Sequence, residues 1–184
     1  MLKQASPFVF SSDDPILTGR PRGEEILDSL MDYLKGSESD RAFPLDFSNV
    51  EFLDISCADE FLTKLLLRIR SGELETRFVF VQNANLSVKE TLQAVLQLRG
   101  IAILMKDNGG VEILGEIKRP IREALEILIE RKRVTSAELA EALNKSVNIA
   151  CNRLNLLQRM GLACRLREDS LPGGGRRYYY ESIL

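Results

Sequence analysis

The sequence predicts an α/β fold with a mixed, largely parallel sheet and flanking helices, followed by a small helical unit that ends in a hairpin. Two observations support this expectation. In roughly the first two thirds of the chain, segments with apolar residues at helical spacing alternate with short apolar strands, as in sheets whose strands are joined by helical crossovers. After Pro120, three helix-period segments lead to two strands around a glycine-rich stretch.

Glycines and capping motifs divide the first part of the chain into elements. A helix with Ile26 to Leu34 inward stops at Gly36, and a helix near residues 87–98 opens with the capping-box spacing Ser87-x-x-Glu90. Another helix is expected at 58–69. The expected strands are 43–47, 77–82, 101–105 and, after a hairpin turn at 107–110, the returning strand 111–114.

Three helix starts can be located in the second part. Pro120 suits a first helical turn, Thr135-x-x-Glu138 has the spacing of a capping box, and Ser146 can cap the third helix. Strands are expected at 162–166 and 176–180. We therefore expect two domains, residues 1–117 and 118–184.

Composition limits the classes of function. The 184 residues include no histidine, which excludes Ser-His-Asp and Cys-His nucleophile activation and histidine-ligated metals within the chain. Cys57, Cys151 and Cys164 form no C-x-x-C pair, and no apolar run is long enough to span a membrane. These features predict a soluble cytoplasmic protein with no membrane contact, which is not an enzyme and has no catalytic residues, metal site or cofactor.

Charge is divided unevenly along the chain. Residues 1–118 contain 13 Lys and Arg against 19 Asp and Glu, a net charge of −6, whereas residues 119–184 contain 12 against 8, a net charge of +4. A basic half is typical of a nucleic-acid-binding domain. An ordinary solvated surface can carry the same balance, so the charge leaves both interpretations open.

The stretch LDFSNVEFLDISCADEF, residues 45–61, places a small hydroxyl, Ser56, between acids where a loop becomes a helix. Three roles fit this position: a helix cap, with Asp59 three residues on; a phosphorylation site; or a nucleophile. No histidine or nearby lysine is present to activate a nucleophile. A phosphate on Ser56 would lie among Asp54, Asp59 and Glu60, which already supply negative charge.

This stretch resembles the STAS superfamily, the fold of anti-sigma-factor antagonists, and more closely the STAS-like domain of unknown function, over about residues 16–105. The residues in register are Leu45, Asp46, Ser48, Val50, Phe52, Asp54 and Ser56. The resemblance implies a domain that binds a protein partner or a small ligand, and phosphorylation of Ser56 by a partner kinase. The antagonists usually have glycine after this serine, where this chain has Cys57.

The stretch TSAELAEALNKSVNIACNRLNLLQRMGLACRLRED, residues 135–169, resembles the winged helix-turn-helix regulators of bacteria, over about residues 119–183. The positions of their three-helix core are filled by Leu139, Leu143, Leu154, Leu157, Gly161 and Leu162. The resemblance implies DNA binding by the helix that follows Ser146, with a hairpin wing beside it.

The residues themselves are compatible with DNA binding. On the third helix, the side away from Ala150 and Leu154 carries asparagines, whose amides can pair with adenine in the major groove. Arginines of the hairpin can meet phosphates. The asparagines and arginines can equally form an ordinary solvated surface, or this domain can bind a protein instead of DNA. The expected DNA-binding residues are Ser146, Asn148, Asn152, Asn155, Arg165, Arg167, Arg176 and Arg177.

Together these features predict a transcriptional regulator in which a STAS-like sensing domain, with a protein or small-molecule ligand, is coupled to a DNA-binding winged helix. Winged helices often bind palindromic sites as dimers, so a homodimer is compatible with this prediction. The alternative is an interaction switch of the antagonist kind that binds no DNA and is controlled by phosphorylation of a serine.

Overall fold

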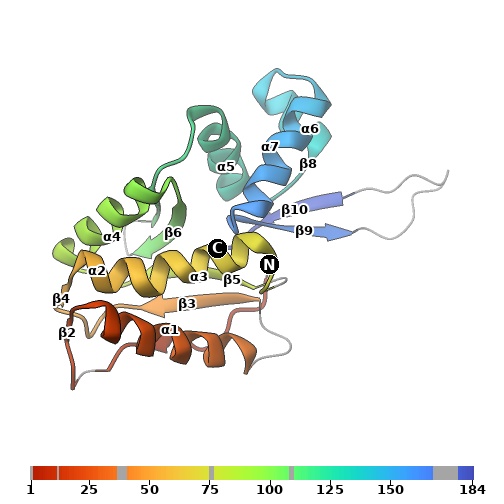
Figure 1. Cartoon of the computed structure of the whole chain (residues 1–184). Coiled ribbons are helices and arrows are strands. Elements are labelled where there is room, and N and C mark those ends of the chain that lie inside the picture. The colour runs from red at the N-terminus through yellow and green to blue at the C-terminus, as the bar shows by residue number, and fades with distance from the viewer. Residues whose placement is uncertain (1, 12, 37–40, 75–76, 108–109, 168–177) are drawn as a thin grey trace. The chain divides into compact units, whose positions relative to one another are not determined.

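The computed structural model describes residues 2–11, 13–36, 41–74, 77–107, 110–167 and 178–184. The chain divides into two compact units, Lys3–Glu116 and Ile117–Leu184 (Figure 1). Whether residues 1–117 and 118–184 fold as independent domains stays a prediction. No helix in the described part of the chain is both long and apolar enough to cross a membrane.

The first unit is built on a five-stranded sheet that is parallel except at one edge. The strand order is β1 (Phe8–Val9), β3 (Ala42–Asp46), β5 (Phe78–Gln82), β6 (Ala102–Asp107) and β7 (Gly110–Gly115), with only β7 antiparallel to its neighbour. A separate parallel pair joins β2 (Ile16–Leu17) to β4 (Phe52–Leu53). The expected mixed, largely parallel α/β class is thereby confirmed.

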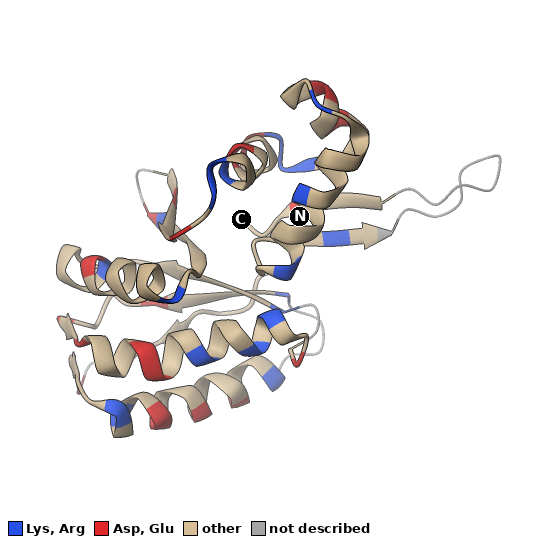
Figure 2. Cartoon of the chain, turned by 45° about the horizontal axis from the view of Figure 1, so that its top comes forward, with Lys and Arg blue, Asp and Glu red and all other residues tan. Residues whose placement is uncertain are grey.

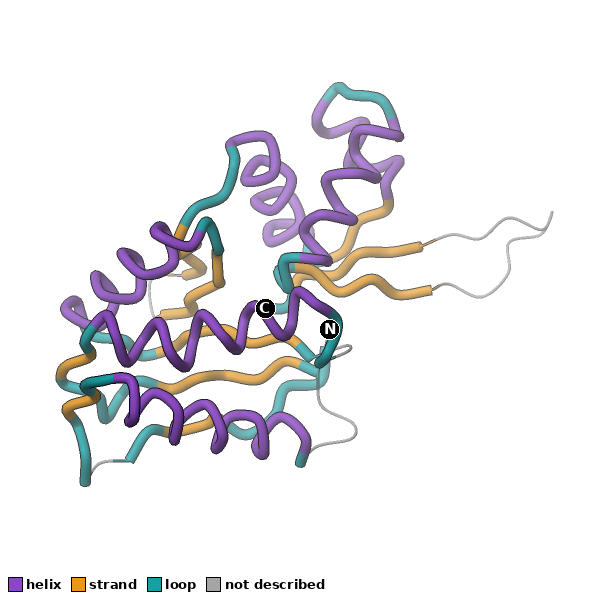
Figure 3. Tube along the Cα trace, in the orientation of Figure 1, coloured by secondary structure: helices purple, strands orange, loops and turns teal. Residues whose placement is uncertain are grey.

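Helices connect these strands and pack on one another. The first is α1 (Arg20–Lys35), and a continuous helical run follows from α2 (Ile55–Ala58) through a π-helical turn, η1 (Asp59–Thr63), to α3 (Lys64–Ser71). The last is α4 (Leu86–Arg99). The run packs against both α1 and α4 and lies between them in the traces of Figures 1 and 3.

The core of this unit joins the sheet to the helical run. Phe43 and Leu45 of β3, and Phe61 and Leu65 of the run, are fully buried. The rings of Phe10 and Phe47 stack with their centroids 4.4 Å apart. Burying such side chains stabilises the fold by roughly 1.5–3 kcal/mol each, so this apolar layer holds the helices in position over the strands.

Two expected helix starts in this unit are wrong. The run expected to begin at Ala58 begins at Ile55 and is capped by Asp54. The helix expected to open with a capping box at Ser87 is capped by Asn85, whose Oδ1 accepts a hydrogen bond of 2.9 Å from Val88 N. Asn85 takes this role because its amide also donates to the carbonyls of Val50 and Glu51 and is thereby anchored to an earlier loop.

The second unit contains three helices and a small antiparallel sheet. In chain order its elements are α5 (Arg119–Arg131), β8 (Arg133–Thr135), α6 (Ser136–Leu143), α7 (Val147–Arg159), β9 (Ala163–Arg167) and β10 (Tyr178–Ser182), and the sheet order is β8-β10-β9. Strand β8 was not expected. The strand expected at 176–180 is β10, and residues 176 and 177 lie outside the described residues.

The predicted caps of this unit are confirmed. Thr135 and Glu138 form a complete capping box at the start of α6. Ser146 caps α7, with its Oγ accepting from Ile149 N at 3.4 Å. Asn144 ends α6 in the left-handed conformation, at φ 51°, so that only three residues separate the two helices.

The packing of α1 against the helical run depends on the absence of a side chain at Gly23. A Cβ atom at this position would lie 2.5 Å from Glu60 Cβ and 2.8 Å from the carbonyl oxygen of Cys57. No side chain fits at that separation without moving the backbone.

We therefore expect Gly23→Ala to lower the free energy of unfolding by about 1–3 kcal/mol, because α1 has to move away from the run. Gly36→Ala is the matched control, because its Cβ would lie 3.4 Å from the nearest atom and its φ of −68° suits alanine. Urea unfolding of both variants measures the difference. Equal stability of the two would contradict the close packing.

Candidate functional site

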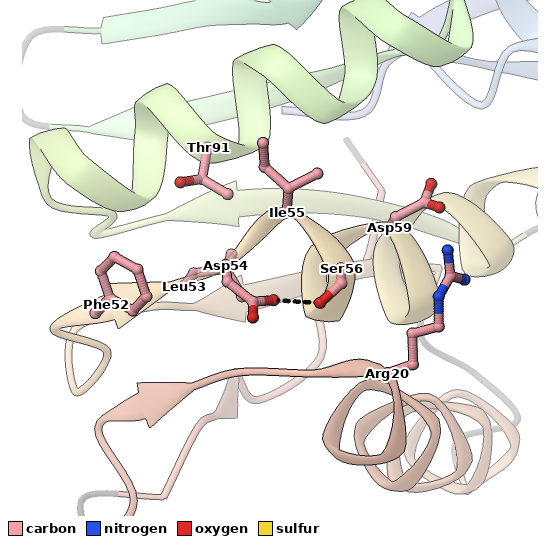
Figure 4. Close-up of a pocket in the computed structure, with 8 residues that line it drawn as sticks. All are labelled: Arg20, Phe52, Leu53, Asp54, Ile55, Ser56, Asp59 and Thr91. Atoms are coloured by element: carbon pink, nitrogen blue, oxygen red, sulfur yellow. Dashed lines mark hydrogen bonds between the residues drawn. The ribbon is translucent and has the colours of Figure 1, made fainter.

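A depression of about 620 Å³ opens at the start of α2 in the first unit. Figure 4 shows the side chains that line it, which combine charged, polar and apolar groups. Phe52 and Ile55 are about half exposed, at 45% and 53%. In this view Arg20 lies on the side of Ser56 away from Phe52, and its side chain is 62% exposed. The predicted phosphorylation site, Ser56, therefore lies on an accessible surface.

Asp54 organises this site. One of its oxygens accepts hydrogen bonds from Cys57 N at 2.6 Å and Ser56 Oγ at 2.9 Å, and the other accepts from Gly19 N at 2.9 Å. Burial alone would raise the pKa of Asp54, but these bonds outweigh it and hold the pKa below its ordinary value. The carboxylate thus caps α2 and ties it to the residue before α1.

Ser56 is not the cap of this helix, so that interpretation is wrong. It is the second residue of α2, and its hydroxyl donates to Asp54, as the dashed line in Figure 4 marks. Asp54 precedes the helix and reaches the free N–H groups first, which leaves Ser56 half-buried and bonded to the capping carboxylate. Because the pKa of Asp54 is lowered, this carboxylate is a weak base toward the hydroxyl.

The basic side chains around Ser56 are engaged by acids. Arg99 of α4 makes two hydrogen bonds to Asp59, of 2.8 and 2.5 Å, and these lower the pKa of Asp59. Arg20 lies 3.1 Å from Glu60, which is 2% exposed and also pairs with Lys64. Each cation in contact with the site is therefore partly neutralised.

A second depression, of about 380 Å³, continues from the first between α2 and α4. It shares Arg20, Ile55 and Asp59 with the first and adds Leu98, which is 76% exposed. Exposed apolar side chains therefore line both depressions, with Ile55 common to the two. This mixture of apolar and charged groups suits contact with another molecule.

The second unit presents the predicted asparagines on α7. Asn148 and Asn152 are exposed and lie one helical turn apart, on the side opposite the buried residues Ala150, Leu154 and Leu157. Ser146, the cap, is exposed next to them. The structure therefore brings these three predicted residues onto one surface.

Asn155 differs from the other two asparagines because it has partners inside the unit. Its Oδ1 accepts a hydrogen bond of 2.8 Å from the hydroxyl of Tyr180, and its amide donates to Cys151 Sγ at 3.5 Å. Burial raises the pKa of Tyr180, with Cys151 adding to this effect and Arg165 opposing it. These contacts link α7 to β10.

The hairpin residues are described only in part. Arg165 is exposed on β9, and its guanidinium carbon lies 4.3 Å from the centroid of the Tyr178 ring. Arg165 is paired across the two strands with Tyr180, whose hydroxyl bonds to Asn155, so the structure brings Arg165 near Asn155. The side chain of Arg167, and Arg176 and Arg177 altogether, lie outside the described residues.

Several other exposed residues of the second unit were not among the predicted DNA-binding residues. Arg159 follows Asn152 by seven residues on the same side of α7, and helical spacing alone could have identified it. Arg133 lies 3.8 Å from the Tyr179 ring centroid, but it belongs to β8, which was not expected. Val147 and Ile149 are exposed on α7, at 51% and 43%.

Helix α1 of the first unit and helix α7 of the second differ in the charges that they expose. The exposed side of α1 carries four acids, and red segments follow this helix in Figure 2, whereas α7 is mostly tan. The acids are Glu24, Glu25, Asp28 and Asp32. The exposed side of α7 thus presents mainly amide and apolar groups, with Arg159 in its last turn as an exposed cation.

No protein-family model and no curated protein matches this chain.

The hydrogen bonds of Asp54 predict an acid-sensitive stability. Its folded-state pKa is lowered, so its contribution is present above the ordinary carboxyl pKa of 3.8 and is lost as the pH falls through the folded-state value. Asp54→Asn keeps one acceptor oxygen but cannot accept from Gly19 N while capping Cys57 N. We expect this variant to lose about 1–3 kcal/mol of unfolding free energy near neutral pH.

This deficit should shrink as the solution is acidified. Urea unfolding followed from about pH 7 to about pH 2 measures it. Ser56→Ala is the control, because it removes one donor from Asp54 and leaves the charge and the cap in place. A constant difference between Asp54→Asn and the wild type at every pH would show that the carboxylate charge does not stabilise this site.

Proposed function

We propose that the protein is a transcriptional regulator in which an acidic STAS-like domain receives a signal and a basic winged helix binds DNA through α7. The observation that carries this proposal is the surface of α7, where exposed amides follow a capped helix start on the side opposite the core. Asn148 and Asn152 would reach base edges in the major groove, and Ser146 would face the backbone.

The arrangement of the second unit supports this proposal. Helices α6 and α7 are separated by the short turn at Asn144, which is the spacing of a helix-turn-helix. Strands β9 and β10 pair antiparallel in the place expected for a wing. Arg165 projects from β9 close to Asn155, so it can meet a phosphate while α7 occupies the groove.

A second candidate function, an interaction switch controlled at Ser56, is favoured by the surface of the first unit. The half-buried hydroxyl of Ser56 lies beside exposed Phe52 and Ile55. A phosphate on Ser56 would displace its bond to Asp54 and add about two negative charges next to that carboxylate. The local change in charge would alter what can bind there.

The DNA proposal predicts different effects for base and phosphate contacts. Asn152→Ala should relax sequence preference, at a cost of roughly 1–3 kcal/mol for the preferred site. Arg165→Ala should weaken binding to all sequences alike and lower the slope of affinity against salt by about one unit. Fluorescence anisotropy on genomic fragments, at several salt concentrations and with the oligomeric state measured alongside, separates the two effects.

Arg70→Ala provides the matched control, since it removes an exposed cation from the first unit and should leave DNA binding unchanged. Failure to bind any fragment of the source genome at low salt, with or without cell extract, would contradict the DNA proposal. The interaction switch would then be the better account.

The interaction switch makes its own prediction for Ser56. Ser56→Asp places a charge beside Asp54 and should abolish binding of a protein partner from cell extract, while circular dichroism remains that of the wild type. Ser56→Ala should retain the partner. A Ser56→Asp variant that still captures the partner would contradict control at this residue.

A further inference from the structure

We propose that α7 recognises A·T base pairs, with Asn148 and Asn152 contacting adenine and Val147 and Ile149 contacting the methyl group of thymine. This inference rests on the proposed DNA binding and specifies the class of sequence that the same surface takes. It follows from the residues that the first half of α7 exposes and from the placement of the nearby cations.

The exposed residues at the start of α7 are amides and aliphatic side chains. Val147, Asn148 and Ile149 form its first turn, and Asn152 follows one turn after Asn148. At about 100° per residue, Ile149 lies about 80° to one side of the direction that the two asparagines share, and Val147 about 120° to the other. Val147 is nevertheless half exposed because it is the first residue of the helix. The first turns of a recognition helix are the part that meets base edges.

These side chains match the groups that an A·T pair presents in the major groove. Adenine offers N7 as an acceptor and its 6-amino group as a donor, which a side-chain amide can satisfy together. Thymine adds a methyl group that cytosine lacks, and exposed aliphatic side chains can cover it. Val147 and Ile149 would lose exposed apolar surface in this contact, whereas they gain nothing from facing water.

Guanine recognition would need a cation in the same place, because arginine and lysine are the residues that pair with its O6 and N7. The two cations of α7 are poorly placed for it. Arg153 has a side chain only 13% exposed and lies 3.6 Å from Glu123 of α5. Arg159 is in the last turn, about 10 Å along the axis from Asn152.

Lys145 is the exposed cation nearest the start of α7, but it precedes the cap Ser146. A helix N-terminus attracts phosphates through its dipole and free N–H groups, and a cation beside it adds to that attraction. Lys145 would therefore add affinity for any sequence. The first turns of α7, which would contact the bases, expose uncharged side chains: Val147, Asn148, Ile149 and Asn152.

The test begins with selection from a library of random DNA duplexes by the full chain. The expected result is enrichment of A·T pairs in the bound sites. In a selected duplex, replacing thymine by deoxyuridine removes only the methyl group and should weaken binding about fourfold. Replacing adenine by 7-deazaadenine removes N7 and should weaken binding by about tenfold.

Variants assign these effects to residues. Val147→Ala should make binding less sensitive to deoxyuridine, and Asn152→Ala should make it insensitive to 7-deazaadenine at one position. Gln158→Ala, at an exposed position in the last turn of α7, should keep both sensitivities. Circular dichroism confirms that each variant is folded.

The possible failures are distinguishable. Selected sites rich in G·C pairs, or sensitivity to deoxyuridine that Val147→Ala leaves unchanged, would overturn this inference and leave DNA binding intact. Salt-dependent binding without sequence preference would do the same. Failure to retain any duplex of the library at low salt would overturn both this inference and the proposed function.

Discussion

The first unit depends on one carboxylate, that of Asp54. It accepts from the residue before α1, from the first turn of α2 and from the hydroxyl of Ser56. The backbone N–H of Asp54 donates to the carbonyl oxygen of Leu17 in β2. A strand, two helix starts and the candidate phosphorylation site therefore meet at this one residue, and its carboxylate makes all of these contacts except the one to the strand. Because the group is partly buried, each of these bonds is stronger than it would be in water.

The close approach of α1 to the helical run depends on the same region. Gly23 lets the two backbones come together, and the π-helical turn places Glu60 beside that contact. Glu60 is buried, so its charge is tolerated only because Arg20 and Lys64 pair with it at the surface. The tight packing and the buried ion pairs thus support one another.

Much of the fold could be predicted from local patterns. Alternating helical and strand periods predicted the α/β class, and the side-chain spacing at Thr135 and Ser146 predicted two caps, because these interactions span only three residues. The Asp54 and Asn85 caps also span only three residues and involve common capping residues, so local spacing could have found them. What the sequence does not show is that each cap is anchored to a distant segment, to Gly19 in one case and to Val50 in the other. Spacing along the chain carries no signal of such contacts.

The candidate site shows the same limit. Asn148, Asn152 and Asn155 look equivalent in the sequence, but Tyr180 bonds only to the last of them, across 25 residues. Arg153 likewise looks available on α7, although Glu123 of another helix engages it. Helical spacing can place a side chain on the solvent side of a helix. Whether the polar groups of that side chain are already bonded to a neighbouring residue depends on the fold.

The three-residue turn between α6 and α7 has a mechanical consequence. Asn144 ends α6 in a left-handed conformation, and Ser146, two residues later, caps the start of α7. So short a link limits the orientations that the two helices can adopt relative to each other. Because α6 and α7 also pack on each other, we expect a displacement of α6 to move the surface of α7 with it.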